Sequence, residues 1–264
     1  MMDVLYLFLA GLAGLGVGSL VNIVIFRRND GRELFGRSRC RVCQEPLALL
    51  DMIPLLGFFR LRGKCRSCSL PISWQYPILE LLTGILFMVL FSRAYFGFWM
   101  PSFVGSGEWF LLFLRDASLF PFLLIIAVYD FRYFRILDRY SLIAVVIAIL
   151  WNIALGMPAL SMMAGMAVLG GFFGIQYVIS KGAWMGGGDI RLGLVLGAYL
   201  GLEVGLVAVF LSYLVGAIVG GVLLFLKKRT LHSAVPFGAF LTTSAIFCAL
   251  YGEVIWNWYR MLTF

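Results

Sequence analysis

The chain has 264 residues, of which 62% are hydrophobic and only 13% are charged, and its formal net charge is +8. A soluble domain averages about 45–50% apolar and about 25% charged residues, so this composition excludes an ordinary soluble protein and indicates several membrane crossings. The positive charge does not indicate nucleic-acid binding, because basic residues in a membrane protein mark its cytoplasmic loops.

A membrane-spanning helix needs about 20 mostly apolar residues. The sequence predicts eight such helices, over residues 4–26, 77–97, 109–130, 140–157, 160–180, 190–202, 203–226 and 236–252. The sixth is short, and only residues 201–203 separate it from the seventh. The predicted fold is therefore all-α, a polytopic membrane protein with about eight transmembrane helices.

The basic residues predict the orientation. They gather in residues 27–76, in Arg132, Arg135 and Arg139, in Lys181 and Arg191, and in Lys227, Lys228 and Arg229. With eight spans, all four groups lie on one side of the membrane, whereas the loops 98–108, 158–159 and 201–203 contain no Lys or Arg. The positive-inside rule then places the basic loops in the cytoplasm and both termini outside. Arg115 and Asp116, nearer the outer end of the third span, are expected to mark an outer interface or a helix that starts later.

Four of the five cysteines fall in residues 27–76, as CRVC (Cys40, Cys43) and CRSC (Cys65, Cys68). Each CxxC pair offers two thiolates from one tight turn, so two pairs complete a tetrahedral zinc site, which is expected to be structural because protein fills every position. An iron–sulfur cluster and a redox pair are the alternatives. The predicted organisation is a first transmembrane helix (1–26), a small zinc-ribbon-like cytoplasmic domain (27–76) and a membrane domain (77–264). The fifth cysteine, Cys248, lies in an apolar run and is predicted to be a buried packing residue.

Two carboxylates are predicted to lie at the same membrane face. Asp130 ends the third span in LIIAVYDFRYFRILD, and Asp189 starts the sixth in GGGDIRL. The two helices between them return the chain to the same side of the membrane. Two close carboxylates share a proton, so that one acts as a base on water and the other as an acid, as in aspartic proteases. Gly186 and Gly188 would let the backbone approach the substrate.

The alternative is structural. Each aspartate can pair with a nearby arginine, Arg132 or Arg191, or cap a helix. Asp138, at the start of the fourth span, is a third acidic candidate. We rank it below the pair because it is also suited to the N-cap region of a helix.

Six segments, in order along nearly the whole chain, resemble the type IV prepilin peptidases. They are GSLVNIVIFR (18–27), IPLLGFFRLRGKCRSC (53–68), PISWQYPILELLTG (71–84), YDFRYFRILD (129–138), GGGDIRL (186–192) and AVPFGAFL (234–241). The chain departs from the family pattern at Leu137, where Pro is usual, at Arg191, where Lys is frequent, and inside CRVC, which lacks a Pro. These departures concern fine specificity rather than the reaction class.

The resemblance implies an enzyme of the bacterial inner membrane that cleaves the leader peptide of prepilins and pseudopilins, in type IV pili and type II secretion, at the cytoplasmic face. Asp130 and Asp189 would be catalytic, Gly186 and Gly188 would lie in the catalytic loop, and the partners would be leader peptides and membrane lipid, without nucleic acid. Many members also N-methylate the new N-terminal residue with S-adenosylmethionine, an activity associated with the cysteine domain.

The methyl-donor site rests on this analogy alone. Asn22, Gly63 and Glu80 are its candidates, and their structural alternatives are helix packing, a turn before the second CxxC and an ion pair with an arginine. Two rival functions remain: a peptidase that does not methylate, and a non-catalytic zinc-ribbon scaffold or transporter whose membrane acids mark an ion path.

Overall fold

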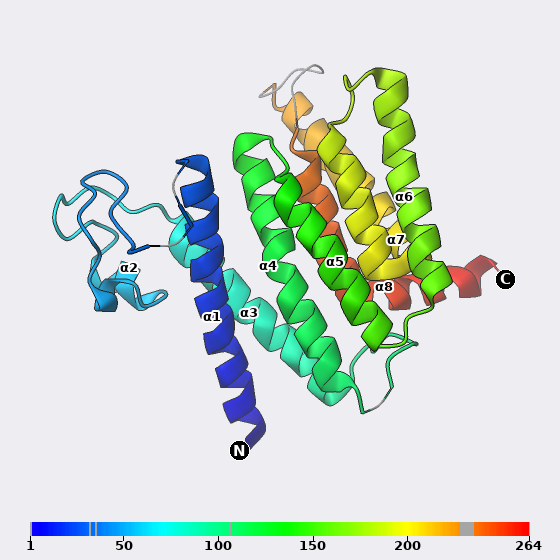
Figure 1. Ribbon diagram of the computed structural model, residues 1–264, viewed down its shortest axis with the longest axis horizontal. Coiled ribbons are helices and arrows are strands. Elements are labelled where there is room, and N and C mark those ends of the chain that lie inside the picture. The colour runs from blue at the N-terminus through cyan, green and yellow to red at the C-terminus, as the bar shows by residue number, and fades with distance from the viewer. Residues whose placement is uncertain (1, 32, 35, 106, 228–234, 264) are drawn as a thin grey trace. The chain divides into compact units, whose positions relative to one another are not determined.

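The computed structural model describes residues 2–31, 33–34, 36–105, 107–227 and 235–263. Within them the chain is helical, with two isolated β-bridges and no strand, which confirms the predicted all-α fold (Figure 1). Of the predicted basic groups, Arg32, Lys228 and Arg229 lie outside the described residues. The elements are α1 (Met2–Asn29), the 3-10 helix η1 (Leu49–Asp51), α2 (Leu56–Arg60), α3 (Gln75–Phe96), α4 (Trp109–Tyr133), α5 (Asp138–Ala154), α6 (Ala159–Ser180), α7 (Gly187–Phe225) and α8 (Phe237–Thr263).

Six helices of the described chain, α1, α3, α4, α6, α7 and α8, are long and apolar enough to cross a membrane. α5 is also apolar, but it has only 17 residues. α7 has 39 residues and is interrupted at Gly201, whose φ of 74° and ψ of −171° are not helical. With α5 and the two halves of α7 counted separately, each of the eight predicted spans is a helix.

The two halves of α7 form a hairpin. Twelve residues beyond Gly201, the hydroxyl of Tyr213 donates to Oε1 of Gln176 near the end of α6 (3.1 Å) and lies 3.8 Å from the sulfur of Met185, just before α7 begins. The chain has therefore returned to the level at which α7 started. Only glycine readily adopts the backbone conformation found at Gly201.

The start of α4 corrects one expectation. The helix begins at Trp109, so Arg115 and Asp116 lie inside it rather than before a later start, and their place at an outer interface stays a prediction. They are only 2% and 1% exposed and form an ion pair with each other. At the other end, Phe134 takes a left-handed conformation and its N–H bonds to the carbonyl of Asp130 (2.8 Å), which ends the helix close to the candidate site.

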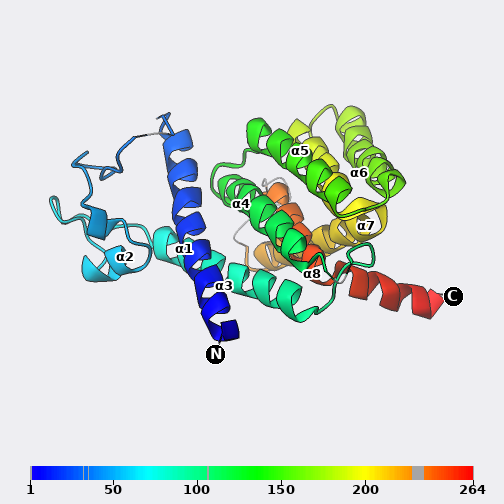
Figure 2. The same cartoon turned by 60° about the horizontal axis from the view of Figure 1, so that its bottom comes forward.

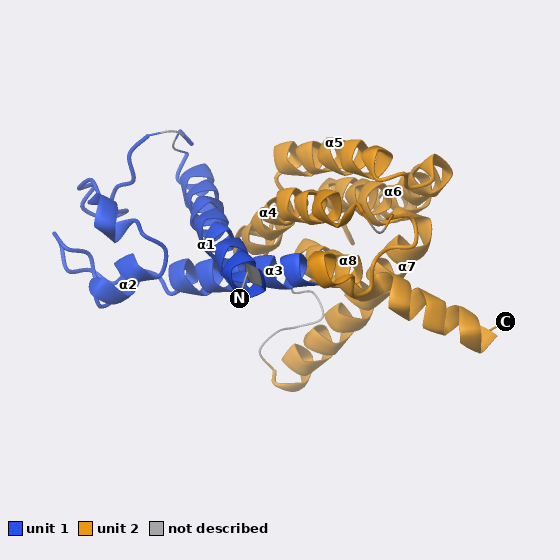
Figure 3. Cartoon of the chain, turned by 90° about the horizontal axis from the view of Figure 1, so that it is seen from below, with its two compact units in different colours: residues 1–92 blue, residues 93–264 orange. Residues whose placement is uncertain are grey.

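The chain divides into two compact units, residues Met1–Ser92 and Arg93–Phe264, with the border inside α3 (Figure 3). In the first unit, α1 packs on α3 through the small-residue spacing Gly14/Gly18. A Cβ at Gly14 would lie 2.5 Å from the carbonyl oxygen of Thr83 and 2.7 Å from Cβ of Phe87. Such close backbone approach is how small residues join membrane helices.

The second unit is built around α7, which packs against α5, α6 and α8 (Figure 2). Its approach to α6 is very close, because a Cβ at Gly197 would collide with the backbone of Gly165, and one at Gly165 would lie 2.8 Å from the carbonyl carbon of Gly201. Leu196 and Tyr199 are almost fully buried there, and Cys248 is buried as predicted.

Candidate active site and metal centre

Asp130 lies in the last turn of α4 and is 5% exposed. Its Oδ2 accepts the N–H of Ala239 at 3.0 Å, in the first turn of α8. A Cβ at Gly238 would lie 2.9 Å from the same oxygen, so glycine is what lets the carboxylate reach the helix end. The free N–H groups and the dipole of a helix N-terminus favour a negative charge at this point.

Asp189 lies in the first turn of α7 and is 6% exposed. Its Oδ2 accepts the N–H of Gly186 (3.1 Å), and its own N–H donates to the carbonyl of Gly186 (3.1 Å). The second oxygen, Oδ1, is buried and has no hydrogen-bond partner among the described residues. A buried acceptor without a partner costs about 1–3 kcal/mol, so this oxygen marks a place that a water or a substrate donor can occupy.

Ile136, in the loop between α4 and α5, connects the surroundings of the two aspartates. A Cβ at Gly188 would lie 2.6 Å from Cβ of Ile136, and a Cβ at Gly238 would lie 2.9 Å from its Cδ1. The structure thus brings the two predicted acids and the glycine loop into one site.

The structural alternatives for the two aspartates are met in part. Arg191 pairs with Asp138, whose side chain is 57% exposed, and the ion pairs of the described chain include neither Asp130 nor Asp189. Both aspartates do cap helices, as the preceding hydrogen bonds show. Capping occupies one oxygen of Asp189 and leaves the other available for chemistry.

The sequence alone assigned no role to four residues that contribute to this site. Gly238 and Ala239 belong to the segment AVPFGAFL, in which Pro236 just before a helix signals an N-terminus. Ile136 gives no such signal, because its role depends on glycines 52 and 102 residues away. Tyr213 is the fourth: its ring packs 4.9 Å from that of Phe237, at the start of α8.

The two CxxC turns have the same backbone structure. The N–H of Cys40 donates to the carbonyl of Glu45 (2.9 Å), as that of Cys65 does to the carbonyl of Leu70 (2.8 Å). One isolated β-bridge closes each turn, Arg39 with Pro46 and Lys64 with Pro71. The repeated geometry aims two pairs of sulfurs at one point.

The four sulfurs fit a zinc ion. All lie within 4.8 Å of one another, and the pairs Cys40–Cys68 and Cys43–Cys65 are each 3.9 Å apart. Tetrahedral Zn–S bonds of about 2.3 Å would place the sulfurs about 3.8 Å apart. The donor set, four thiolates with no oxygen ligand, also suits zinc or an iron–sulfur cluster rather than a hard cation.

The thiols differ in acidity. Burial raises the pKa of Cys40, but the N–H groups of Cys43 and Val42 outweigh it and lower that pKa to about 6. The backbone of Glu45 lowers the pKa of Cys43, whereas desolvation and the neighbouring thiols raise it to about 12. A metal ion binds cysteines as thiolates, so its binding would release the protons of these thiols.

The three candidate methyl-donor residues are only partly together. Asn22 is fully buried between α1 and α3, where its Nδ2 donates to the carbonyl of Tyr76 (3.3 Å) and its Oδ1 accepts from Gln75 (3.1 Å). Glu80, one turn further along α3, accepts the N–H of Leu55 (2.8 Å) and forms no ion pair with an arginine in the described chain. Gly63 lies in a turn against the ring of Phe58, with φ of 68°.

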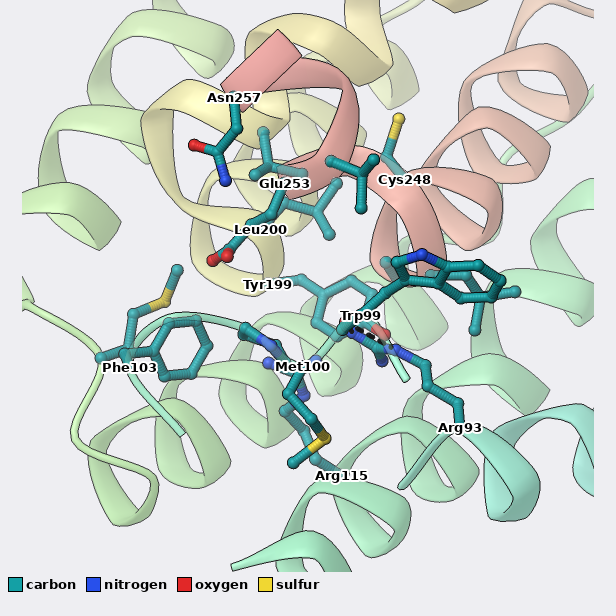
Figure 4. Close-up of a pocket in the computed structure, with 16 residues that line it drawn as sticks. Arg93, Trp99, Met100, Phe103, Arg115, Tyr199, Leu200, Cys248, Glu253 and Asn257 are labelled. Carbon is teal, nitrogen blue, oxygen red and sulfur yellow. Dashed lines mark hydrogen bonds between the residues drawn. The ribbon is translucent and has the colours of Figure 1, made fainter. Parts of the chain in front are cut away.

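A pocket of about 90 Å³ lies elsewhere, lined by Arg93, Arg115, Tyr199 and Glu253 among others (Figure 4). Tyr199 is ten residues from Asp189 along α7, about 15 Å along the helix axis, so this pocket is not part of the carboxylate site. Its arginines are engaged: Arg93 donates to Asp116 (3.0 Å) and to the carbonyl of Trp99 (3.0 Å). The pocket therefore belongs to a buried polar network that supports the fold.

Comparison with known proteins identifies the family. The profile of the "Bacterial Peptidase A24 N-terminal domain" matches residues 12–94, and that of the "Type IV leader peptidase family" matches residues 117–221. The "Prepilin leader peptidase/N-methyltransferase" of Aeromonas hydrophila is 30% identical over 97% of this chain and 94% of that protein. Proteins of the same name from Legionella pneumophila (30%, 94% and 92%) and Klebsiella pneumoniae (35%, 75% and 85%) are also similar. No solved structure matches the chain. The chain belongs to the type IV leader peptidase family.

Proposed function

We propose that this protein cleaves the leader peptide of prepilins or pseudopilins, with Asp130 and Asp189 as its catalytic residues. The observation that carries the proposal is the pair of buried carboxylates, each fixed at a helix N-terminus, with Oδ1 of Asp189 unpartnered. The relatives are about 30% identical to this chain over nearly its whole length, and their names support the substrate class.

In the proposed mechanism, Oδ1 of Asp189 takes a proton from a water molecule as that water attacks the scissile carbonyl carbon. Protonated Asp130 donates its proton to the carbonyl oxygen as the tetrahedral intermediate forms. When the intermediate collapses, the C–N bond breaks and the leaving amine takes a proton from Asp189. Asp130 takes back a proton from the hydroxyl group of the intermediate, which becomes the carbonyl of the product acid. The two aspartates then hold one proton between them, as they did at the start. Gly188, which has no side chain, leaves room for Ile136 in the loop that follows Asp130.

Asparagine substitution tests this assignment on the full chain in nanodiscs, with a peptide that carries a basic leader, then Gly, then Phe. Asp130→Asn and Asp189→Asn should each lower the cleavage rate by about 10²–10⁴-fold, because each removes an acid–base group. The matched control is Asp138→Asn, which removes an exposed carboxylate of the same region and should leave the rate unchanged. Cleavage that survives both catalytic substitutions would refute the assignment. A wild-type protein that never cleaves would favour the scaffold or transporter.

The basic loops support an orientation with the site at the cytoplasmic face of the bacterial inner membrane and both termini outside.

We further propose that the protein N-methylates the new N-terminal residue with S-adenosylmethionine, as the names of the relatives suggest. Asn22, Glu80 and Gly63 remain the candidate site, and Gln75 joins them because its Oε1 is buried beside Asn22 and has no hydrogen-bond partner in the described part of the chain. Mass spectrometry of the processed peptide distinguishes the two enzymes: an added CH₂ supports methyl transfer, and its absence at saturating S-adenosylmethionine favours a peptidase alone.

The cysteines are proposed to hold one structural zinc ion. Zinc would supply much of the folding energy of a domain with so small a core. The purified protein should contain about one zinc per chain by elemental analysis, and Cys40→Ser with Cys65→Ser should lose it and make residues 36–74 more sensitive to protease. Cys248→Ser, which changes the buried fifth cysteine, is the control and should keep its zinc. Iron or labile sulfide in place of zinc would contradict the assignment.

A further inference from the structure

The first unit exposes a set of large apolar side chains outside its long helices. Leu49 in η1 and Leu56 and Phe59 in α2 are 77%, 64% and 61% exposed. Leu56, Phe59 and Arg60 are three and four residues apart, so they share one face of α2, whereas Gly57 and Phe58 are buried. Exposed apolar side chains gathered in this way indicate an interaction surface.

Basic residues follow this apolar set directly. Arg60, Arg62 and Lys64 are exposed, and none of them takes part in an ion pair within the described chain. Arg66, the next basic residue, is paired with Asp51 at 2.6 Å. We call Leu49, Leu50, Leu56 and Phe59 together with Arg60, Arg62 and Lys64 the η1–α2 surface. Its charge is complementary to that of an anionic partner.

The η1–α2 surface is fixed at a defined level of α3. Oε2 of Glu80 accepts the N–H of Leu55, just before α2, and Glu80 is five residues beyond the start of α3, about 7 Å along the helix axis. Figures 1 and 2 show α2 beside the N-terminal end of α3. The ring of Phe58 also packs 4.9 Å from that of Trp74, the residue before α3. Because α3 is long and apolar enough to cross a membrane, its first turns are where the helix would enter one.

We propose that the η1–α2 surface lies in the headgroup region of the membrane and binds anionic phospholipids. Leu49, Leu56 and Phe59 enter the acyl boundary, and Arg60, Arg62 and Lys64 bind lipid phosphates. Amphipathic segments at a membrane surface enter it by about 5–10 Å, which agrees with the level set by Glu80. α1 precedes the η1–α2 segment in the chain and α3 follows it. Both are candidate membrane spans, so lipid is the partner that adjoins the segment on both sides. The proposal concerns the first unit and does not depend on the roles of Asp130 and Asp189.

Hydrogen–deuterium exchange on the full chain in nanodiscs tests the charge dependence. Amides of residues 49–60 should exchange more slowly in phosphatidylcholine discs that contain phosphatidylglycerol than in phosphatidylcholine alone. The double variant Arg60→Gln/Arg62→Gln should weaken binding to the anionic surface by up to about 25-fold, since each charge strengthens it about fivefold. The difference in exchange between the two lipids should therefore be largely lost. The matched control Arg37→Gln/Arg39→Gln removes two exposed charges of the same domain and should keep the difference. Equal exchange in both lipids, or an equal loss in the control, would overturn the proposal.

Photo-crosslinking identifies the occupant. With p-benzoylphenylalanine in place of Phe59, irradiation in the mixed nanodiscs should give an adduct with the mass of a phospholipid. A crosslink to a second copy of the chain, or to an added substrate peptide, would assign the surface to that partner and refute the lipid proposal. A protein that fails to cleave peptides would still give the lipid adduct, so failure of the catalytic proposal is distinguishable from failure of this one.

Discussion

Gly187 and Gly188 are neighbours in the chain but have different surroundings. A Cβ at Gly187 would meet no atom within 4 Å, whereas a Cβ at Gly188 would lie 2.6 Å from Ile136. The glycine at position 188 is therefore required by a contact, and the contact is with the loop that follows Asp130. At the scale of single residues, the position of the two carboxylates depends on the absence of a Cβ at residue 188.

A double-mutant cycle tests this contact. Gly188→Ala should displace Ile136 and lower the peptide cleavage rate by about 10²-fold, because small displacements of a catalytic group are costly. Ile136→Ala in the same protein should restore part of the rate, since it removes the colliding atoms. Gly187→Ala is the matched control and should cleave normally. If Gly187→Ala lowers the cleavage rate as much as Gly188→Ala, the loss reflects the glycine loop in general rather than the contact with Ile136.

The hairpin of α7 is the element that carries Asp189 to its place. Its first half ends at Gly201, which leaves the carbonyl groups of the last helical turn without intrahelical partners. Nδ2 of Asn152 in α5 supplies two of the missing bonds, to the carbonyls of Ala198 (2.8 Å) and Tyr199 (2.9 Å). The break in α7 is thus stabilised by hydrogen bonds from the neighbouring helix α5.

Substitution of Gly201 should therefore destabilise the fold. Gly201→Ala forces a side chain into a backbone conformation almost restricted to glycine and places a Cβ 2.6 Å from Oγ of Ser161, so we expect a loss of about 1–3 kcal/mol in the free energy of unfolding. Thermal unfolding in nanodiscs measures it. Gly220→Ala, in the second half of the same helix and in open space, should unfold at or above the wild-type temperature. A Gly201→Ala protein as stable as Gly220→Ala would show that the break is not required.

At the scale of the molecule, a buried ionic network holds the second unit together at the end away from the aspartates. Asp116 accepts from Arg93 (3.0 Å), from Arg115 (2.8 Å) and from the hydroxyl of Tyr199 (2.7 Å). Arg115 donates in turn to Asn152 (3.1 Å). One carboxylate thereby joins the end of α3, α4, α5 and α7.

Removing this carboxylate should be far more costly than removing an exposed one. Asp116→Asn leaves two buried guanidinium groups without a counterion, and we expect a loss of about 3–5 kcal/mol in the free energy of unfolding. Asp138→Asn breaks the more exposed pair with Arg191 and should cost about 1 kcal/mol or less. Thermal unfolding of the two variants in the same nanodiscs compares them. Equal melting temperatures would show that the buried network contributes no more than a surface pair.

The sequence by itself determined the features that depend on local pattern. Apolar length predicted the all-α fold and the spans, because every backbone polar group in lipid must be satisfied within a helix. The break near residues 201–203, the CxxC pairs and the two helix-end aspartates were also visible, since each is encoded within a few consecutive residues.

Only the tertiary structure decided which distant groups meet. Gly14 and Gly18 pack closely against α3, whereas Gly174 and Gly220, also four residues from another glycine, meet nothing within 4 Å, and Gly197 packs against the backbone of Gly165. The hydrogen bond from Ala239 to Asp130 and the contact of Ile136 with Gly188 join residues 109 and 52 positions apart. Nothing local in the chain encodes such pairs, because they arise from the way the helices are turned and stacked around α7.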